Sequence, residues 1–152
     1  MGAVRYLHTN IVAAEWRSLA EFYARVFGCE EVPPQRDLSG DELERGTGVA
    51  GAAFRGVHLR LPGHGPGGPT LEIFQYQQLE ERAPAAANRL GLAHLAFAVE
   101  DVEQARAEVL ARGGRSIGDI VTTRIDEDRS VTWCYVTDPE GNMIELQRST
   151  QG

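Results

Sequence analysis

Polar and apolar positions follow the same order twice along the chain. Near residue 8, and again near residue 94, a short run rich in aliphatic and aromatic side chains predicts a strand. Each run leads into apolar residues at helical spacing. These faces are Trp16, Leu19, Phe22, Tyr23, Val26 and Phe27 in the first copy, and Val102, Ala105, Val109 and Leu110 in the second. We expect the helices to end at Gly28 and at Gly113–Gly114, and the second to begin at Asp101 with Gln104 at position N3.

The register of these features indicates an internal duplication. His8 and His94 are 86 residues apart, and so are the glycines that follow the two helices. Each copy ends on a predicted strand with a central glutamate, but Glu72 and Glu145 are only 73 residues apart, so the first copy is 13 residues longer. We assign the excess to the polar stretch 33–48 and the glycine-proline run 62–69, two turn-rich segments that could act as lids.

Each copy therefore reads as β-α-β-β-β. The predicted fold class is α+β, with two βαβββ modules whose sheets combine around one cleft. Module one covers about residues 4–77, a polar and alanine-rich linker about 78–90, and module two about 91–148. A chain of 152 residues is long enough for one domain, so we assign both modules to a single domain over 1–152.

Composition and charge exclude several classes of protein. With 15 basic and 22 acidic residues the net charge is −7, and no basic patch is present to bind nucleic acid. No apolar run approaches the ~20 residues that a membrane-spanning helix needs. Cys29 and Cys134 are too few for a disulfide framework, and the first ten residues lack a signal layout, so we expect a cytoplasmic location. All basic residues are arginine, so proton transfer would fall to carboxylates rather than to lysine.

Potential metal ligands recur at the duplicated positions. Each copy has one histidine in its first strand and one glutamate in its last: His8, Glu72, His94 and Glu145. A carboxylate between apolar strand neighbours is costly to desolvate unless something pairs with it. Two imidazoles and two carboxylates suit a divalent first-row transition ion with two octahedral positions left open. From the pattern alone an ordinary hydrogen-bonded histidine and a solvent-facing glutamate remain the alternative.

Two further pairs of residues place polar groups on one face of a predicted strand. Asn10 and Tyr6 lie on the same face as His8 and could line a cleft. His58 and Arg60 share one face of a predicted strand over 56–61. They could bind an anionic group of a substrate, although a solvated sheet face is the interpretation we favour.

Four segments make the chain resemble the vicinal oxygen chelate superfamily. This superfamily includes glyoxalase I, methylmalonyl-CoA epimerase, extradiol dioxygenases, and the fosfomycin- and bleomycin-resistance proteins. The segments are Leu7-His8-Thr9 with Phe22-Tyr23 through Phe27-Gly28, Leu71-Glu72-Ile73, Gly91-Leu92-Ala93-His94-Leu95-Ala96-Phe97 and Asp138-Pro139-Glu140-Gly141-Asn142-Met143-Ile144-Glu145-Leu146. The resemblance extends from about residue 4 to residue 147. It implies the same paired βαβββ modules, forming a curved mixed sheet around a metal cleft.

Within the superfamily, the set His8, Glu72, His94 and Glu145 resembles the metal ligands of the glyoxalase I and epimerase branches. Glyoxalase I commonly has an arginine four residues after its first ligand and an asparagine four residues after its second, and both contact glutathione. The matching positions here are Val12 and Tyr76. The resemblance therefore implies a substrate that is not a glutathione adduct.

The resemblance implies a metal-dependent isomerase, epimerase or lyase that acts on a small molecule with vicinal oxygens through an enediolate. The divalent ion (Ni, Co, Zn, Mn, Fe or Mg) would polarise the substrate, and Glu145 or Glu72 would act as the catalytic base. We expect the substrate to contact Asn10, Phe74, Tyr76 and Met143.

Two other functions stay open. Bleomycin-type members bind a small molecule without turnover and usually lack the metal ligands. An iron-dependent dioxygenase is disfavoured, because four protein ligands leave too few positions for substrate and oxygen. We expect a homodimer, with no membrane or nucleic-acid partner, and the metal site lies either within one chain or across the dimer interface.

Overall fold

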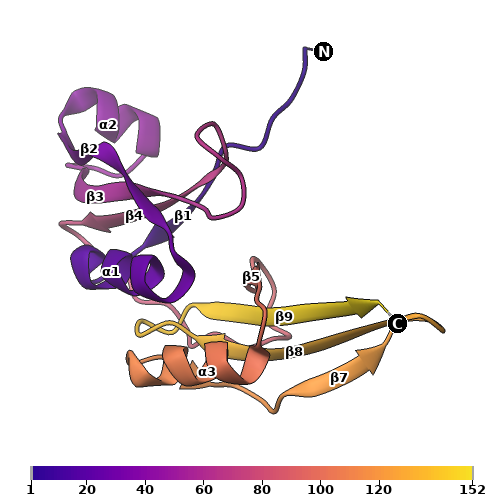
Figure 1. Ribbon diagram of the computed structural model, residues 1–152. Coiled ribbons are helices and arrows are strands. Elements are labelled where there is room, and N and C mark those ends of the chain that lie inside the picture. Colours follow the sequence, from indigo (N-terminus) through magenta and orange to yellow (C-terminus); the bar gives the residue numbers. More distant parts are fainter. Residues whose placement is uncertain (1, 152) are drawn as a thin grey trace. The chain divides into compact units, whose positions relative to one another are not determined.

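The computed structural model describes residues 2–151, and the side chains of residues 2–150. Two compact units make up the chain, unit 1 over residues 1–81 and unit 2 over residues 82–152 (Figure 1). No helix in the described part of the chain is long and apolar enough to cross a membrane.

Unit 1 is a four-stranded mixed sheet with one long helix on one face. Its elements are β1 (His8–Val12), α1 (Trp16–Phe27), β2 (Glu30–Ser39), α2 (Asp41–Thr47), β3 (Ala53–Arg60) and β4 (Thr70–Tyr76). The strand order is β1-β4-β3-β2, and β1 runs parallel to β4 while the other pairs are antiparallel. This order places the first strand of the unit directly beside its last strand.

Helix α1 forms where the sequence predicts it and buries most of the predicted face, with Val26 and Phe27 partly exposed. Leu19 and Tyr23 are almost fully buried, as are Leu59 and Ile73 on the sheet that α1 covers. The helix ends at Gly28, which has φ 69° and donates its backbone N–H to the carbonyl of Ala24. A positive φ of this size suits glycine, which has no Cβ to clash with the backbone.

Unit 2 repeats this plan with a smaller helix. Its elements are β5 (Leu95–Ala98), α3 (Val102–Ala111), β6 (Arg115–Ser116), β7 (Val121–Arg124), β8 (Arg129–Thr137) and β9 (Met143–Gln151). The strand order is β5-β9-β8-β6, β7 also pairs with β8, and β5 runs parallel to β9. The first and last strands of the unit again lie side by side. The predicted α+β class is confirmed, and the strands form two separate mixed sheets, one in each unit.

Helix α3 begins as predicted but buries less than predicted. The Asp101 side chain accepts a hydrogen bond from the backbone N–H of Gln104 at 2.9 Å, which is the expected N-cap. Val102 and Val109 are buried, whereas Leu110 is 41% exposed, so its assignment to the buried face was wrong. Leu110 follows Val109 directly and therefore lies about 100° further round the helix.

The stretch 33–48, expected to be a polar loop, instead forms most of β2 and the short helix α2. Its polar side chains are compatible with a strand because β2 is at the edge of the sheet and is largely exposed. The prolines Pro33 and Pro34 lie at the irregularity between Val32 and Arg36, where the ladder with β3 is interrupted. Proline lacks a backbone N–H, so such an interruption at an edge is where a strand accepts it. The other candidate lid, 62–69, is a turn-rich connection between β3 and β4, as expected.

Candidate functional site

The parallel pairing of β1 and β4 brings His8 to Glu72 on the face of the sheet opposite α1. The Nδ1 atom of His8 lies 3.4 Å from Oε1 of Glu72. Asn10 is directly opposite Glu72 in the ladder, and its Nδ2 donates a hydrogen bond to Oε2 at 3.2 Å. A predicted metal ligand and a predicted substrate contact thus lie against the same carboxylate.

A third side chain reaches Glu72 from β3. His58 is the cross-strand neighbour of Glu72, and its Nε2 lies 3.2 Å from Oε1. Its other ring nitrogen, Nδ1, lies 3.4 Å from the hydroxyl oxygen of Thr70. The structure therefore places His58 beside the carboxylate and only 20% exposed, where the sequence suggested a solvated face or an anion contact.

Burial lowers the pKa of His58 below its ordinary value. The negative charge of Glu72 opposes this shift, and the positive charge of Arg36 adds to it. His58 therefore favours its neutral form at neutral pH, with one ring nitrogen protonated and the other able to accept.

The pairing of His58 with Glu72 follows from the hairpin that joins β3 and β4. The backbone N–H of Leu61 donates to the carbonyl of Pro69, and Gly65 lies at the midpoint of this loop. A hairpin folded symmetrically about Gly65 sets residue 58 opposite residue 72. This symmetry of the glycine-rich loop is the signal in the sequence that could have identified His58.

The contacts around Glu72 account for its burial. The residue is 8% exposed, between the fully buried Leu71 and Ile73. A buried carboxylate without partners is costly, and here both of its oxygens face nitrogen atoms of neighbouring side chains. This face of the sheet is therefore built around the carboxylate.

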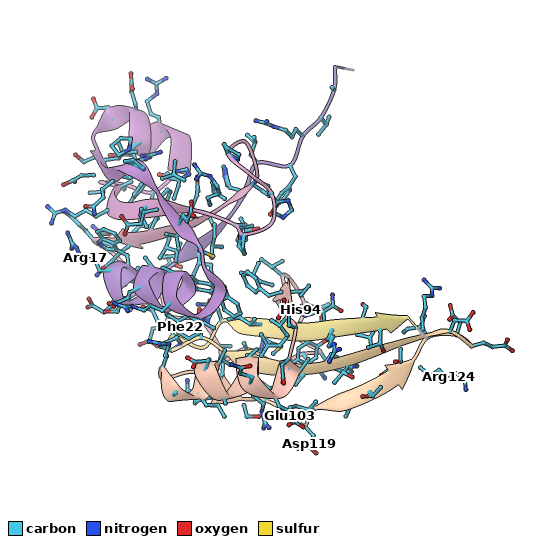
Figure 2. All side chains as sticks on the ribbon, in the orientation of Figure 1. Arg17, Phe22, His94, Glu103, Asp119 and Arg124 are labelled. Carbon is cyan, nitrogen blue, oxygen red and sulfur yellow. The ribbon has the colours of Figure 1, made fainter. Side chains whose placement is uncertain are left out.

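Unit 2 holds the second histidine–glutamate pair in a simpler environment. His94 directly precedes β5, and its Nε2 lies 3.0 Å from Oε2 of Glu145. Figure 2 shows His94 on the side of the sheet opposite α3. The positions that correspond to Asn10 and His58 are occupied by Ala96, opposite Glu145 on β5, and by Tyr135, opposite it on β8.

The predicted substrate contacts on β4 belong to an aromatic cluster. Phe74 stacks on Phe54 with ring centroids 4.4 Å apart, and Tyr76 lies 5.2 Å from Phe54. Gly56 makes room for this stack, because a Cβ there would lie 2.7 Å from a ring carbon of Phe74. Phe74 is only 9% exposed, while Tyr76 is partly exposed.

Met143, the fourth predicted substrate contact, shares its strand face with Glu145 on β9 and is 3% exposed. Beside it, the hydroxyl of Thr137 is buried and has no hydrogen-bond partner among the described residues. Met143 therefore has little surface available in unit 2 as it stands.

Each unit contains one of the two duplicated histidine–glutamate pairs, and imidazole and carboxylate are ligands that divalent transition ions take. Among the described residues, no three histidine, cysteine, aspartate or glutamate side chains are arranged so that they could hold a metal ion. In unit 1 the imidazoles of His8 and His58 both approach Oε1 of Glu72. The three side chains are therefore arranged around this carboxylate and not around a common position for an ion.

Comparison with known proteins agrees with this architecture. Solved structures with the same fold include a glyoxalase family protein from Bacillus cereus, 17% identical with a TM-score of 0.75, covering 99% of this chain and 95% of that one. A glyoxalase family protein from Enterococcus faecalis is 24% identical, with a TM-score of 0.58 and coverage of 96% and 97%. A glyoxalase I mutant from Zea mays is 19% identical, with a TM-score of 0.64, covering 94% of this chain and 44% of that one.

At these sequence identities the structural similarity shows a shared fold only. No curated protein matches the sequence. The family model described as a glyoxalase-like domain matches residues 8–147, which include both histidine–glutamate pairs. The chain therefore belongs to the glyoxalase-like domain family, within the vicinal oxygen chelate superfamily.

Proposed function

We propose that the protein is a metal-dependent isomerase, epimerase or lyase acting on a small molecule with two neighbouring oxygens. The observation that carries this proposal is the duplicated histidine–glutamate pair, held at 3.4 Å in unit 1 and at 3.0 Å in unit 2 by equivalent parallel strands. The superfamily generally uses divalent metal ions, binds small molecules and often forms dimers, which supports it.

The proposed metal ligands are the pairs His8–Glu72 and His94–Glu145, taken from one chain or from two copies of a homodimer. Nickel, cobalt, zinc, manganese, iron and magnesium are all candidates. When bound, the ion would polarise the two substrate oxygens and lower the pKa of the adjacent C–H group.

The two carboxylates, Glu72 and Glu145, would then have different roles. Glu72 has three side-chain nitrogen atoms within 3.4 Å of its oxygens, whereas Glu145 has His94 as its ion-pair partner among the described residues. A ligating carboxylate that is loosely held can leave the ion and act as the general base, so we assign that role to the less restrained Glu145. Glu72 is the alternative base, and its contacts disfavour it.

The substrate would meet an apolar and aromatic surface rather than a glutathione site. Val12 is 52% exposed on the strand that carries His8, and Tyr76 lies on the strand that carries Glu72. Neither side chain can pair with a carboxylate of glutathione as an arginine could. We therefore propose a small organic substrate with an apolar group, in contact with Asn10, with Tyr76, and with the small exposed parts of Phe74 and Met143.

Metal analysis combined with proton exchange tests the proposal. Protein purified without chelators should carry metal, and its titration with each candidate ion should identify the preferred one. The metal-loaded protein should exchange carbon-bound protons of α-hydroxyketone probes, such as dihydroxyacetone, for deuterium in heavy water. His8→Ala and His94→Ala should lose metal, while His64→Ala, in the exposed loop between β3 and β4, serves as the matched histidine control.

Three outcomes would count against the proposal. Protein that takes up none of the ions, with unchanged behaviour in His8→Ala and Glu145→Gln, would exclude the metal site. Tight binding of small molecules without exchange would identify a binding protein. Oxygen uptake that depends on ferrous iron would identify a dioxygenase.

A further inference from the structure

Glu72 differs from Glu145 in that each of its two oxygens faces a side chain that is not a proposed metal ligand. The Nε2 of His58 lies 3.2 Å from Oε1, and Asn10 donates from Nδ2 to Oε2 at 3.2 Å. These side chains come from the strands on either side of β4, so they restrain the carboxylate from both flanks.

His58 is itself fixed in orientation. The hydroxyl oxygen of Thr70 lies 3.4 Å from Nδ1, and the ring meets Phe74 edge-on with centroids 5.7 Å apart. If the hydroxyl of Thr70 donates to Nδ1, the ring proton is on Nε2 and points at Glu72. Thr70, His58 and Glu72 then form one chain of donors and acceptors.

Unit 2 shows that this arrangement is not a property of the repeated fold. The equivalent of Asn10 is Ala96, which has no donor, and the equivalent of His58 is Tyr135. The Tyr135 ring lies 5.0 Å from the ring of His94, but no hydrogen bond joins Tyr135 to Glu145 among the described residues. The same backbone therefore places the second carboxylate without these two restraints.

We propose that His58 and Asn10 are positioning residues, which hold Glu72 by its two oxygens as the fixed carboxylate ligand of the metal site. This inference rests on the proposed function. Partners that hydrogen-bond to a metal-ligating carboxylate set its orientation, and their loss typically lowers metal affinity by about 10–100-fold. We assign His58 to Glu72 rather than to the ion because His58 has no counterpart in unit 2, where Tyr135 takes its position, whereas His8 has its counterpart in His94.

Three substitutions of His58 test this role in the full-length protein. His58→Phe keeps a ring but has no donor, His58→Ala removes both, and His58→Gln places an amide donor near the original Nε2. With Co²⁺ as the probe, we expect about 10–100-fold weaker binding for the first two, with one ion still bound, and recovery of most of the affinity in His58→Gln. His64→Ala should bind like the wild type.

The visible spectrum of bound Co²⁺ separates positioning from ligation. In a positioning role, His58→Phe keeps the wild-type spectrum once it is saturated with Co²⁺. A changed coordination spectrum would make His58 a ligand, and unchanged affinity in His58→Phe would make it a bystander; either result overturns the inference. Asn10→Leu provides the second variant, with a smaller loss that is less than additive with that of His58→Phe because both act on one carboxylate.

A measurement on the metal-free protein keeps this inference separate from the proposed function. Nitrogen-15 NMR of the imidazole of His58 should show the proton on Nε2 in the wild type, and a shift of that signal in Glu72→Gln. A proton on Nδ1 would overturn the inference even if metal binds. Failure of the wild type to bind metal, with the Nε2 tautomer present, would instead overturn the proposed function and leave the contact to Glu72 in place.

Discussion

Units 1 and 2 repeat one backbone plan but surround the same pair of residues differently. In both, a parallel pair of strands sets a histidine beside a glutamate. In unit 1 the flanking strands add Asn10 and His58, whereas in unit 2 the same positions carry Ala96 and Tyr135. The repeat thus fixes where the two carboxylates lie, and the neighbouring side chains determine how firmly each is held.

The two helices show a similar contrast in what stabilises them. Helix α1 buries five residues, and its N-cap residue Glu15 provides no side-chain cap; the N–H of Trp16 donates instead to the side chain of Gln75 on β4. Helix α3 buries two residues and begins with the Asp101 cap. Packing therefore contributes more to α1, and local hydrogen bonding contributes more to α3.

The largest expected difference between the units concerns the two glutamates. Glu145→Gln should lower turnover of a probe by about 10²–10⁴-fold, because it removes the proposed base. Glu72→Gln should mainly weaken metal binding, with a smaller loss of turnover per bound ion. Metal titration and deuterium exchange, measured on the same preparations, separate the two effects. Equal losses in both variants would show that the carboxylates are interchangeable.

Core packing should distinguish the helices. Leu19→Ala in α1 should lower the free energy of unfolding by about 2–5 kcal/mol, because it leaves a cavity in a close-packed core. Val109→Ala in α3 should cost about 1.6 kcal/mol, since it removes two carbon atoms at about 0.8 kcal/mol each. Both residues are almost fully buried.

The chain has one tryptophan in each unit, Trp16 in α1 and Trp133 in β8, so urea unfolding can be followed separately. Trp133→Phe leaves a reporter in unit 1, and Trp16→Phe leaves one in unit 2. A greater loss for Val109→Ala than for Leu19→Ala would contradict the expected order.

The buried thiols of Cys29 and Cys134 predict how the stability of the fold changes at alkaline pH. Burial raises the pKa of Cys29 from its ordinary value of 9.0 to about 11, and burial also raises the pKa of Cys134. Because the unfolded chain loses the Cys29 proton first, stability is unaffected below about pH 9 and falls as the pH rises from about 9 to about 11. The loss is on the order of 2–3 kcal/mol.

Cys29→Ala should flatten this part of the pH profile relative to wild type in denaturant unfolding. The chain has no lysine, so few other side chains titrate in this window, and the four tyrosines are common to both proteins. A profile that is unchanged in Cys29→Ala would show that the thiol of Cys29 ionises as easily in the folded state as in the unfolded one.

The smallest effect is expected at the start of α3. Asp101→Ala should lower the free energy of unfolding by about 1 kcal/mol, because the N–H of Gln104 loses its acceptor. Asp101→Asn should be nearly neutral, since asparagine caps a helix about as well. Thermal unfolding followed by circular dichroism measures both, and a large loss in the asparagine variant would point to a role for the charge instead of the cap.

Much of the fold is predictable from local pattern. The apolar spacing and Gly28 fix the extent of α1, and Asp101 fixes the start of α3, because these signals depend on neighbours within one or two turns. The stretch 33–48 is different. An exposed edge strand needs only backbone partners, which Gly56 and Phe54 of β3 supply, so its side chains carry no strand pattern.

The candidate site could also be predicted only in part from the sequence. The duplication identifies His8, Glu72, His94 and Glu145 as equivalent pairs, and the structure places each histidine beside its glutamate. Their role as metal ligands stays a prediction. The partner of His58 depends on the register of a hairpin, which is a relation between two strands and is not visible in either strand alone.

The hairpin between β3 and β4 also has a practical use. Its register is held by the contrast between its two faces, with Val57 and Ile73 buried on one and His58 and Glu72 on the other, so a slip of one residue would invert both. The exposed turn around Gly65 is therefore free to vary in length without displacing the strands. A short tag or a fluorophore inserted there would leave the register of β3 and β4, and with it the contact of His58 with Glu72, unchanged.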